Sequence, residues 1–114
     1  MHELGYAVHL VDTLKDFMKE NGLSVISSVT LDVGEATAIV PRFFYDCWPA
    51  AIDEEPTLSG CELKINFIKA RGRCHDCENE YIISEHHGHC PKCGCEDYDF
   101  LSGYEFEISE IRGK

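Results

Sequence analysis

The chain has 114 residues and a formal net charge of −11, with 10 Lys and Arg against 21 Asp and Glu. Hydrophobic residues make up 44% of it, which is enough for a modest core and excludes general disorder. An acidic surface repels nucleic-acid phosphates, so we expect no nucleic acid among the partners and expect cations or basic protein surfaces instead.

The chain begins Met1-His2-Glu3, without the basic and apolar regions of a signal peptide. No apolar stretch approaches the roughly 18 residues that a membrane helix needs. We therefore expect a cytoplasmic protein that does not contact a membrane.

The first residues also form a possible chelate. The amino nitrogen of Met1 and the amide nitrogen of His2 close a five-membered ring with a metal, and the amide and imidazole Nδ1 close a six-membered ring. Three nitrogens in a plane suit Ni(II) or Cu(II), and Glu3 could add its backbone amide or carboxylate. A histidine at position 2 is, however, usually only part of an exposed chain end, so this motif alone does not establish a metal site.

A helix is predicted from about residue 3 to 20, because apolar residues recur at helical spacing and Asn21-Gly22 supplies a stop. The repeating positions are Leu4, Ala7, Val8, Val11, Leu14 and Met18. Residues 25–33 then alternate with a period of two, which predicts a half-buried strand that ends before Gly34.

A second helix is predicted to begin at Pro41 and to run to about Ile52, because proline suits the first helical position. Pro49 is expected to kink or shorten this helix, since its ring removes an amide donor. The polar residues 53–60 predict a loop, and the alternation in residues 61–68 predicts a second strand.

The cysteines give the strongest signal in the chain. Four of the seven form two CxxC pairs, separated by the twelve residues from Glu78 to His89. This spacing predicts a zinc ribbon in which four thiolates surround one ion, whereas an odd total of cysteines does not suit a disulfide framework. The predicted ligands are Cys74, Cys77, Cys90 and Cys93.

Other readings of this region remain open. Four thiolates also bind iron, as in rubredoxin, and a CxxC pair can carry out thiol–disulfide chemistry. Cys95 could compete as a ligand or remain a free thiol beside the site. The histidines of this segment could form a second metal site or a pH sensor, or simply a solvated loop; they are His86, His87 and His89.

A third strand is predicted over residues 104–108, with Tyr104, Phe106 and Ile108 facing inward. Strands on both sides of the cysteine segment indicate that the ribbon is inserted into a sheet. We therefore predict an α+β fold in which two helices pack on a three-stranded antiparallel sheet, with an inserted four-cysteine zinc-ribbon lobe. The expected division is residues 1–69 and 103–114 for the α/β domain, which carries the possible nickel chelate, and 70–102 for the ribbon.

Together these features resemble one family over essentially the whole chain. They are Met-His-Glu-Leu at the start, an amphipathic helix, a strand that ends at Val33-Gly34-Glu35, and a late pair of CxxC motifs followed by Ser-Gly-x-Glu. This combination resembles HypA, the family of nickel-delivery accessory proteins of [NiFe]-hydrogenase maturation. Some positions depart from the family pattern: Gly5 and Cys95 stand where Ser is usual, and Glu78 where Gly is frequent.

The resemblance implies nickel bound by Met1, His2 and Glu3 and structural zinc bound by the four cysteines. It also implies a HypB-type GTPase and the hydrogenase large-subunit precursor as partners, with urease accessory proteins for some members. We expect a metallochaperone that passes Ni(II) on by ligand exchange, because no motif of enzyme chemistry is visible. The alternatives are a zinc-ribbon interaction adaptor and an iron–thiolate electron carrier, which stoichiometric nickel binding would distinguish from a metallochaperone.

Overall fold

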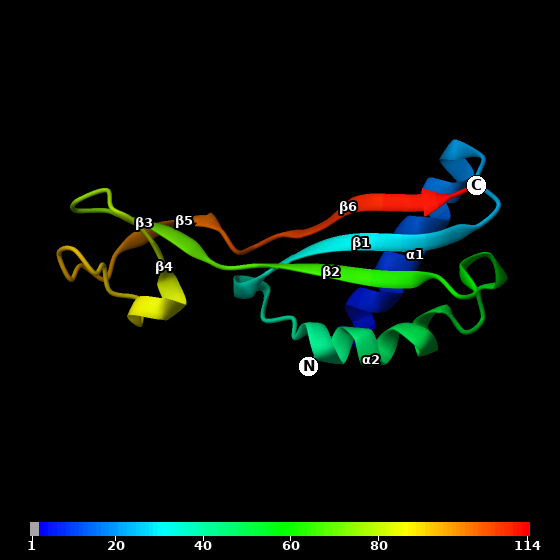
Figure 1. Cartoon of the computed structure of the whole chain (residues 1–114), viewed down its shortest axis with the longest axis horizontal. Helices are drawn as coiled ribbons and strands as arrows, with labels where there is room; N and C mark the ends of the chain where they lie inside the picture. The colour runs from blue at the N-terminus through cyan, green and yellow to red at the C-terminus, as the bar shows by residue number, and fades with distance from the viewer. Residues whose placement is uncertain (1–2) are drawn as a thin grey trace.

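Two three-stranded sheets lie toward opposite ends of an elongated molecule of 54 × 27 × 16 Å (Figure 1). The computed structural model describes residues 3–114. One sheet is covered by the two α-helices, and we call this part the helical lobe. The other sheet, with the turns between its strands, carries the CxxC pairs, and we call it the ribbon lobe.

Helix α1 (Glu3–Asn21) confirms the first predicted element. Its buried apolar side chains recur at helical spacing and face the core: Ala7, Leu10, Val11, Leu14 and Met18. Leu4 and Val8 are exposed, so the apolar stripe is narrower than the sequence indicated. The helix ends at Asn21 and is followed by Gly22, which has a φ of +65°, and the N–H of Leu23 donates to the carbonyl of Met18 at 3.0 Å.

The helical lobe has the strand order β2-β1-β6, with β1 (Ile26–Gly34) between β2 (Glu62–Ile68) and β6 (Phe106–Gly113). The pair β1–β6 is antiparallel, but the pair β1–β2 is parallel. The expected α+β sheet with two helices is confirmed, whereas its fully antiparallel arrangement is wrong. The reason is that α2 (Pro41–Ile52) joins β1 to β2, and a helical crossover returns the chain in the same direction.

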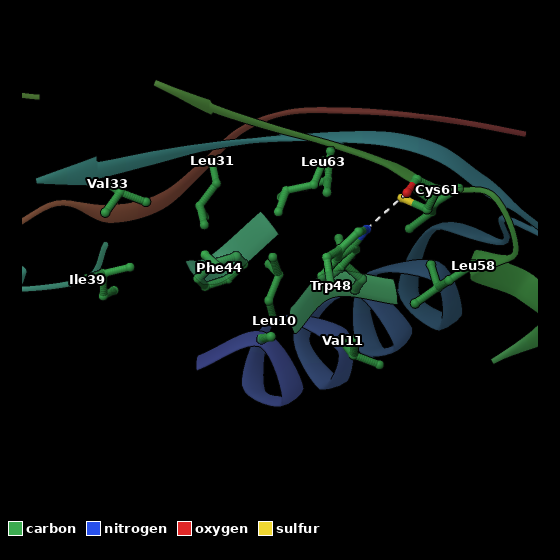
Figure 2. Close-up of a cluster of buried hydrophobic side chains, with 14 of the residues drawn as sticks. Leu10, Val11, Leu31, Val33, Ile39, Phe44, Trp48, Leu58, Cys61 and Leu63 are labelled. Carbon is green, nitrogen blue, oxygen red and sulfur yellow. Dashed lines mark hydrogen bonds between the residues drawn. The ribbon is translucent and has the colours of Figure 1, made fainter. Parts of the chain in front are cut away.

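Helix α2 runs from Pro41 to Ile52 as predicted and passes through Pro49, so the shortening that was expected as an alternative to a kink does not occur. An internal proline costs about 3 kcal/mol, and burial of the helix's aromatic side chains offsets it. Phe44 and Trp48 are buried between α1 and the sheet, and the indole Nε1–H of Trp48 donates to the carbonyl of Cys61 at 2.9 Å (Figure 2).

The ribbon lobe has the order β4-β3-β5, and both pairs are antiparallel. Its strands are β3 (Arg71–Cys74), β4 (Glu80–Ile82) and β5 (Tyr98–Ser102), and a 3-10 turn, η3 (Ile83–His86), follows β4. The buried cluster of this lobe, within the described part of the chain, consists of Cys74, Tyr81 and Cys90.

The chain between the lobes corrects the expectation for the third strand. Tyr104 was expected to face inward from a strand, but its side chain is 64% exposed and β6 starts later, at Phe106. Gly103, with a φ of +120°, interrupts the strand here. Phe67 pairs with buried Val33 but is itself 48% exposed, because it lies where β2 leaves the sheet toward β3. Over residues 3–114, no helix is long and apolar enough to cross a membrane.

Candidate metal centres

The first CxxC pair forms a tight turn at the end of β3. Cys74 closes the strand, and the N–H of Glu78 donates to the carbonyl of Cys74 at 3.0 Å. Glu78 has a φ of +61°, in the left-handed region that glycine occupies without penalty. This turn therefore places a residue with a side chain in a conformation that glycine would adopt without strain.

The second pair repeats this geometry in the segment before β5. The N–H of Gly94 donates to the carbonyl of Cys90 at 2.8 Å, and Gly94 has a φ of +80°. Each pair is thus followed by a residue with positive φ that closes a hydrogen bond to the first cysteine. Two equivalent turns of this kind present their sulfur atoms toward each other.

The sulfur atoms of the four predicted cysteines all lie within 4.8 Å of one another. The Sγ atoms of Cys74 and Cys93 are 3.4 Å apart, and those of Cys77 and Cys90 are 3.5 Å apart. A disulfide bond is only about 2.05 Å long, so these are separate thiols. A tetrahedral zinc ion with Zn–S bonds of about 2.3 Å needs its sulfurs about 3.8 Å apart, so the donor set and its spacing suit structural zinc.

The pKa of the first cysteine thiol in each pair is lowered, which favours the thiolate. The backbone N–H of Cys77 lowers the pKa of the Cys74 thiol, which burial alone would raise. Burial also raises the pKa of the Cys90 thiol, but the N–H groups of Cys93 and Lys92 outweigh it and bring that pKa down to about 6. Backbone donors thus favour negative charge on these sulfurs.

The pKa of the second cysteine thiol in each pair is raised instead. The N–H of Cys95 lowers the pKa of the Cys93 thiol, but the hydrogen bond with the sulfur of Cys74 and burial raise it to about 12. A thiol beside existing thiolates retains its proton because two negative charges repel each other. A divalent cation replaces that proton and removes the repulsion, which is the usual chemistry of a four-thiolate site.

The neighbouring side chains surround this cluster without joining it. Asn79 donates from Nδ2 to the sulfur of Cys90 at 3.8 Å. Cys95 lies outside the group of four, and its carbonyl accepts from the N–H of Cys90 at 2.9 Å. His75 lies within the first CxxC pair but bonds through Nε2 to Asp99 at 2.9 Å, and this bond raises the pKa of His75.

The histidines near the second pair do not belong to a group of three or more metal donors within the described residues. Among residues 3–114, the group that could hold a metal ion is the four cysteines. His89 lies 3.4 Å from Glu96, and the ring of His86 packs edge-on against Tyr81.

The predicted nickel motif begins with Met1 and His2, which lie outside the described residues. Glu3 is the first described residue, and it is only 5% exposed. Its Oε2 accepts the N–H of Val40 at 3.2 Å, and Val40 immediately precedes α2. The start of α1 is therefore anchored at the start of α2, a contact that no local sequence pattern signalled because 37 positions separate the two residues.

A four-thiolate centre on two matching turns, carried by a small ribbon beside an α+β lobe, defines a metal-binding protein. A family model described as "Hydrogenase/urease nickel incorporation, metallochaperone, hypA" matches residues 1–113. The chain belongs to the HypA family, as the sequence resemblance predicted.

Individual relatives agree with this assignment. The hydrogenase maturation factor HypA of Chlorobium luteolum is 33% identical over 112 residues, which cover 97% of this chain and 94% of the relative. The hydrogenase maturation factor HybF of Klebsiella pneumoniae is 28% identical, with both chains covered completely. The solution structure of the nickel metallochaperone HypA from Helicobacter pylori superimposes with a TM-score of 0.72 at 22% identity, covers 99% of this chain and 97% of its own, and supports the fold.

The protein is therefore a nickel metallochaperone of the hydrogenase and urease nickel-incorporation family, with a four-cysteine site that suits zinc.

Proposed function

We propose that the cargo Ni(II) binds at the leading residues Met1, His2 and Glu3. The support is chemical: an amine, an amide nitrogen and an imidazole follow one another along the chain with the spacing of fused chelate rings. Membership of a nickel-incorporation family adds to this support. The site requires a free amino group on Met1, because an amide in its place is a far poorer ligand.

Glu3 supports the proposal through its position. Its carboxylate is engaged by the N–H of Val40, and the residue is buried, so it holds the first turn of α1 against the segment that leads into α2. A donor set at residues 1–3 is then attached to a rigid base. Either the backbone amide or the carboxylate of Glu3 is then a further ligand for nickel.

The zinc ion has a structural role. Cys74, Cys77, Cys90 and Cys93 hold it as a permanent structural ion, and a closed set of four thiolates has no open coordination position for catalysis. The chain accordingly divides into a nickel-binding domain, residues 1–69 and 103–114, and a zinc-ribbon domain, residues 70–102.

Delivery proceeds by ligand exchange, without covalent turnover. Nickel passes from the nitrogen ligands of the chain's first residues to a thiolate-rich acceptor in the large-subunit precursor of a [NiFe]-hydrogenase, in the cytoplasm. A HypB-type GTPase acts in the same pathway, and urease accessory proteins are further candidate partners. Relatives named as hydrogenase maturation factors support this assignment.

Nickel titration of untagged, zinc-loaded protein tests the cargo site. His2→Ala should abolish the nickel site while the zinc content stays the same, and an extension before Met1 should weaken binding. His9→Ala is the matched control, because this exposed histidine of α1 lies outside the chelate. Affinity should fall as the pH falls, since protons compete for the amide and the imidazole. Equal nickel binding by the wild type and His2→Ala would reject this site, and a wild type that binds no nickel would make a zinc-ribbon adaptor the better description.

A further inference from the structure

The two lobes are joined by two connections that run side by side (Figure 1). The outgoing connection, Lys69 and Ala70, links β2 to β3. The return connection, residues 103–105, links β5 to β6. Both meet a short 3-10 turn, η1 (Glu35–Thr37), which directly follows β1 in the helical lobe. This turn is the place where the relative orientation of the lobes is decided.

The turn holds the return connection through its backbone. The N–H of Gly34 donates to the carbonyl of Glu105 at 2.8 Å, and the N–H of Ala36 donates to the carbonyl of Gly103 at 2.7 Å. The carboxylate of Glu105 in turn accepts the N–H of Gly103 at 2.7 Å. These bonds determine where the chain leaves the ribbon.

The side chain of Glu35 holds the outgoing connection and the ribbon itself. Its Oε1 accepts the N–H of Ala70 at 3.0 Å and the hydroxyl of Ser84 at 3.3 Å. Ser84 belongs to η3, beyond β4, so a single oxygen of the helical lobe is bonded both to the outgoing connection and to the ribbon lobe. Ala70 is 5% exposed, and its N–H would lack an acceptor without Glu35.

The end of β5, where the return connection begins, is also bonded to the outgoing connection. The hydroxyl of Ser102 donates to the carbonyl of Lys69 at 2.9 Å and accepts the N–H of Arg71 at 3.3 Å. If one connection is held in place, the other is therefore held too.

Small residues allow this close approach. A Cβ added at Gly34 would overlap the carbonyl of Gly103, and one added at Gly103 would lie 2.8 Å from the Cβ of Ala70. Three backbone segments are thus in direct contact, which keeps the N–H of Ala70 within reach of the Glu35 carboxylate.

We propose that Glu35 is a positioning residue that fixes the orientation of the zinc-ribbon lobe relative to the helical lobe. The same segment continues toward Glu3. The hydroxyl of Thr37 donates to the carbonyl of Gly34 at 2.7 Å and accepts the N–H of Ile39 at 3.2 Å, and Val40 then bonds to Glu3. Residues 34–40 therefore determine both the orientation of the ribbon and the position of residue 3. Only the relevance of residue 3 to nickel rests on the proposed function.

The test compares wild-type protein with Glu35→Ala, both full-length and zinc-loaded, by ¹⁵N relaxation and residual dipolar couplings of the backbone amides. In the wild type both lobes should tumble with one correlation time and share one alignment tensor. In Glu35→Ala we expect this shared value to be lost, with a shorter correlation time for residues 71–102, while the zinc content and the amide shifts of the ribbon core are retained. Glu54→Ala is the matched control, since Glu54 is an exposed carboxylate away from the junction.

Two further variants keep the result decisive. Glu35→Gln retains one acceptor oxygen and should restore most of the common tumbling, and exposed Ser84→Ala removes one of the two donors and should give a smaller change in the couplings. One correlation time and unchanged couplings in Glu35→Ala would overturn the proposal. Nickel affinity measured on the same variant should equal that of the wild type, so failure of the nickel site would be seen separately from failure of the positioning role.

Discussion

The two lobes of this protein are stabilised in different ways. In the part of the chain that the structure describes, the core of the helical lobe contains fifteen buried side chains from both helices, β1, β2 and the segments that connect them. The buried cluster of the ribbon lobe contains three, and two of these are cysteines of the metal centre. Burial of apolar surface therefore suffices for the first lobe, whereas the second must gain its stability from the ion that its thiols bind.

Ion pairs do not alter this comparison. The ribbon lobe carries several, among them those of Arg71 and Arg73 with Glu80, but the side chains involved are largely exposed. Exposed pairs contribute little because water already solvates both charges. In a lobe with so small a core, metal binding is the largest favourable interaction.

The largest predicted effect follows from removing a metal ligand. Cys74→Ala should abolish zinc binding and unfold residues 71–102, because a structural zinc site supplies about 10–16 kcal/mol of apparent binding free energy. The helical lobe should remain folded, since its core does not include the ribbon. Zinc analysis together with the amide spectrum of the ¹⁵N-labelled protein measures both outcomes.

Cys95→Ser serves as the control for that variant. Cys95 lies close to the centre but outside the group of four, so its replacement should preserve zinc and the ribbon signals. Ordered ribbon amides in metal-free Cys74→Ala would show that the two lobes are stabilised in the same way after all.

A core substitution should have the complementary effect. Phe44 is fully buried between α1 and the sheet, so Phe44→Ala should lower the free energy of unfolding of the helical lobe by about 3–5 kcal/mol (Figure 2). Urea unfolding followed by Trp48 fluorescence measures this change, because Trp48 lies in the same core. Zinc content should not change.

The adjacent residue provides the matched control for this variant. Phe43 is exposed on the same helix, so Phe43→Ala should shift the urea midpoint far less. A similar loss in both variants would mean that helix propensity, rather than core packing, controls the stability of this lobe.

The smallest predicted effect concerns a surface ion pair of the helical lobe. Lys15 Nζ lies 3.0 Å from Glu55, and this hydrogen bond raises the pKa of Lys15 above its usual range. The folded chain thus binds this proton more tightly than the unfolded chain does, so the stabilisation is complete below the lysine's ordinary pKa and is lost as the pH rises through the folded-state value.

Glu55→Gln should accordingly lower the urea midpoint slightly at pH 7 and leave it unchanged above the folded-state pKa of Lys15. Glu54→Gln, in the adjacent exposed carboxylate, controls for the change in net charge. A difference that persists at high pH would assign the effect to something other than the protonated lysine.

Local features of the sequence were sufficient for much of the fold and for the zinc site. The CxxC spacing predicted all four clustered cysteines, because two residues between ligands are what one tight turn requires. Helical periodicity predicted α1, and Pro41 located the start of α2, because both signals act within a few residues. The family resemblance added the nickel function, which no spacing in the ribbon contains.

Contacts between distant residues were decided only by the tertiary structure. The parallel pairing of β1 with β2, the continuation of α2 through Pro49 and the exposure of Tyr104 all depend on packing between segments far apart in the chain. The same holds for the bonds of Glu35 to Ala70 and of Glu3 to Val40, which span 35 and 37 positions. Short-range patterns reflect local backbone preferences, whereas these contacts exist only once apolar burial has brought the segments together.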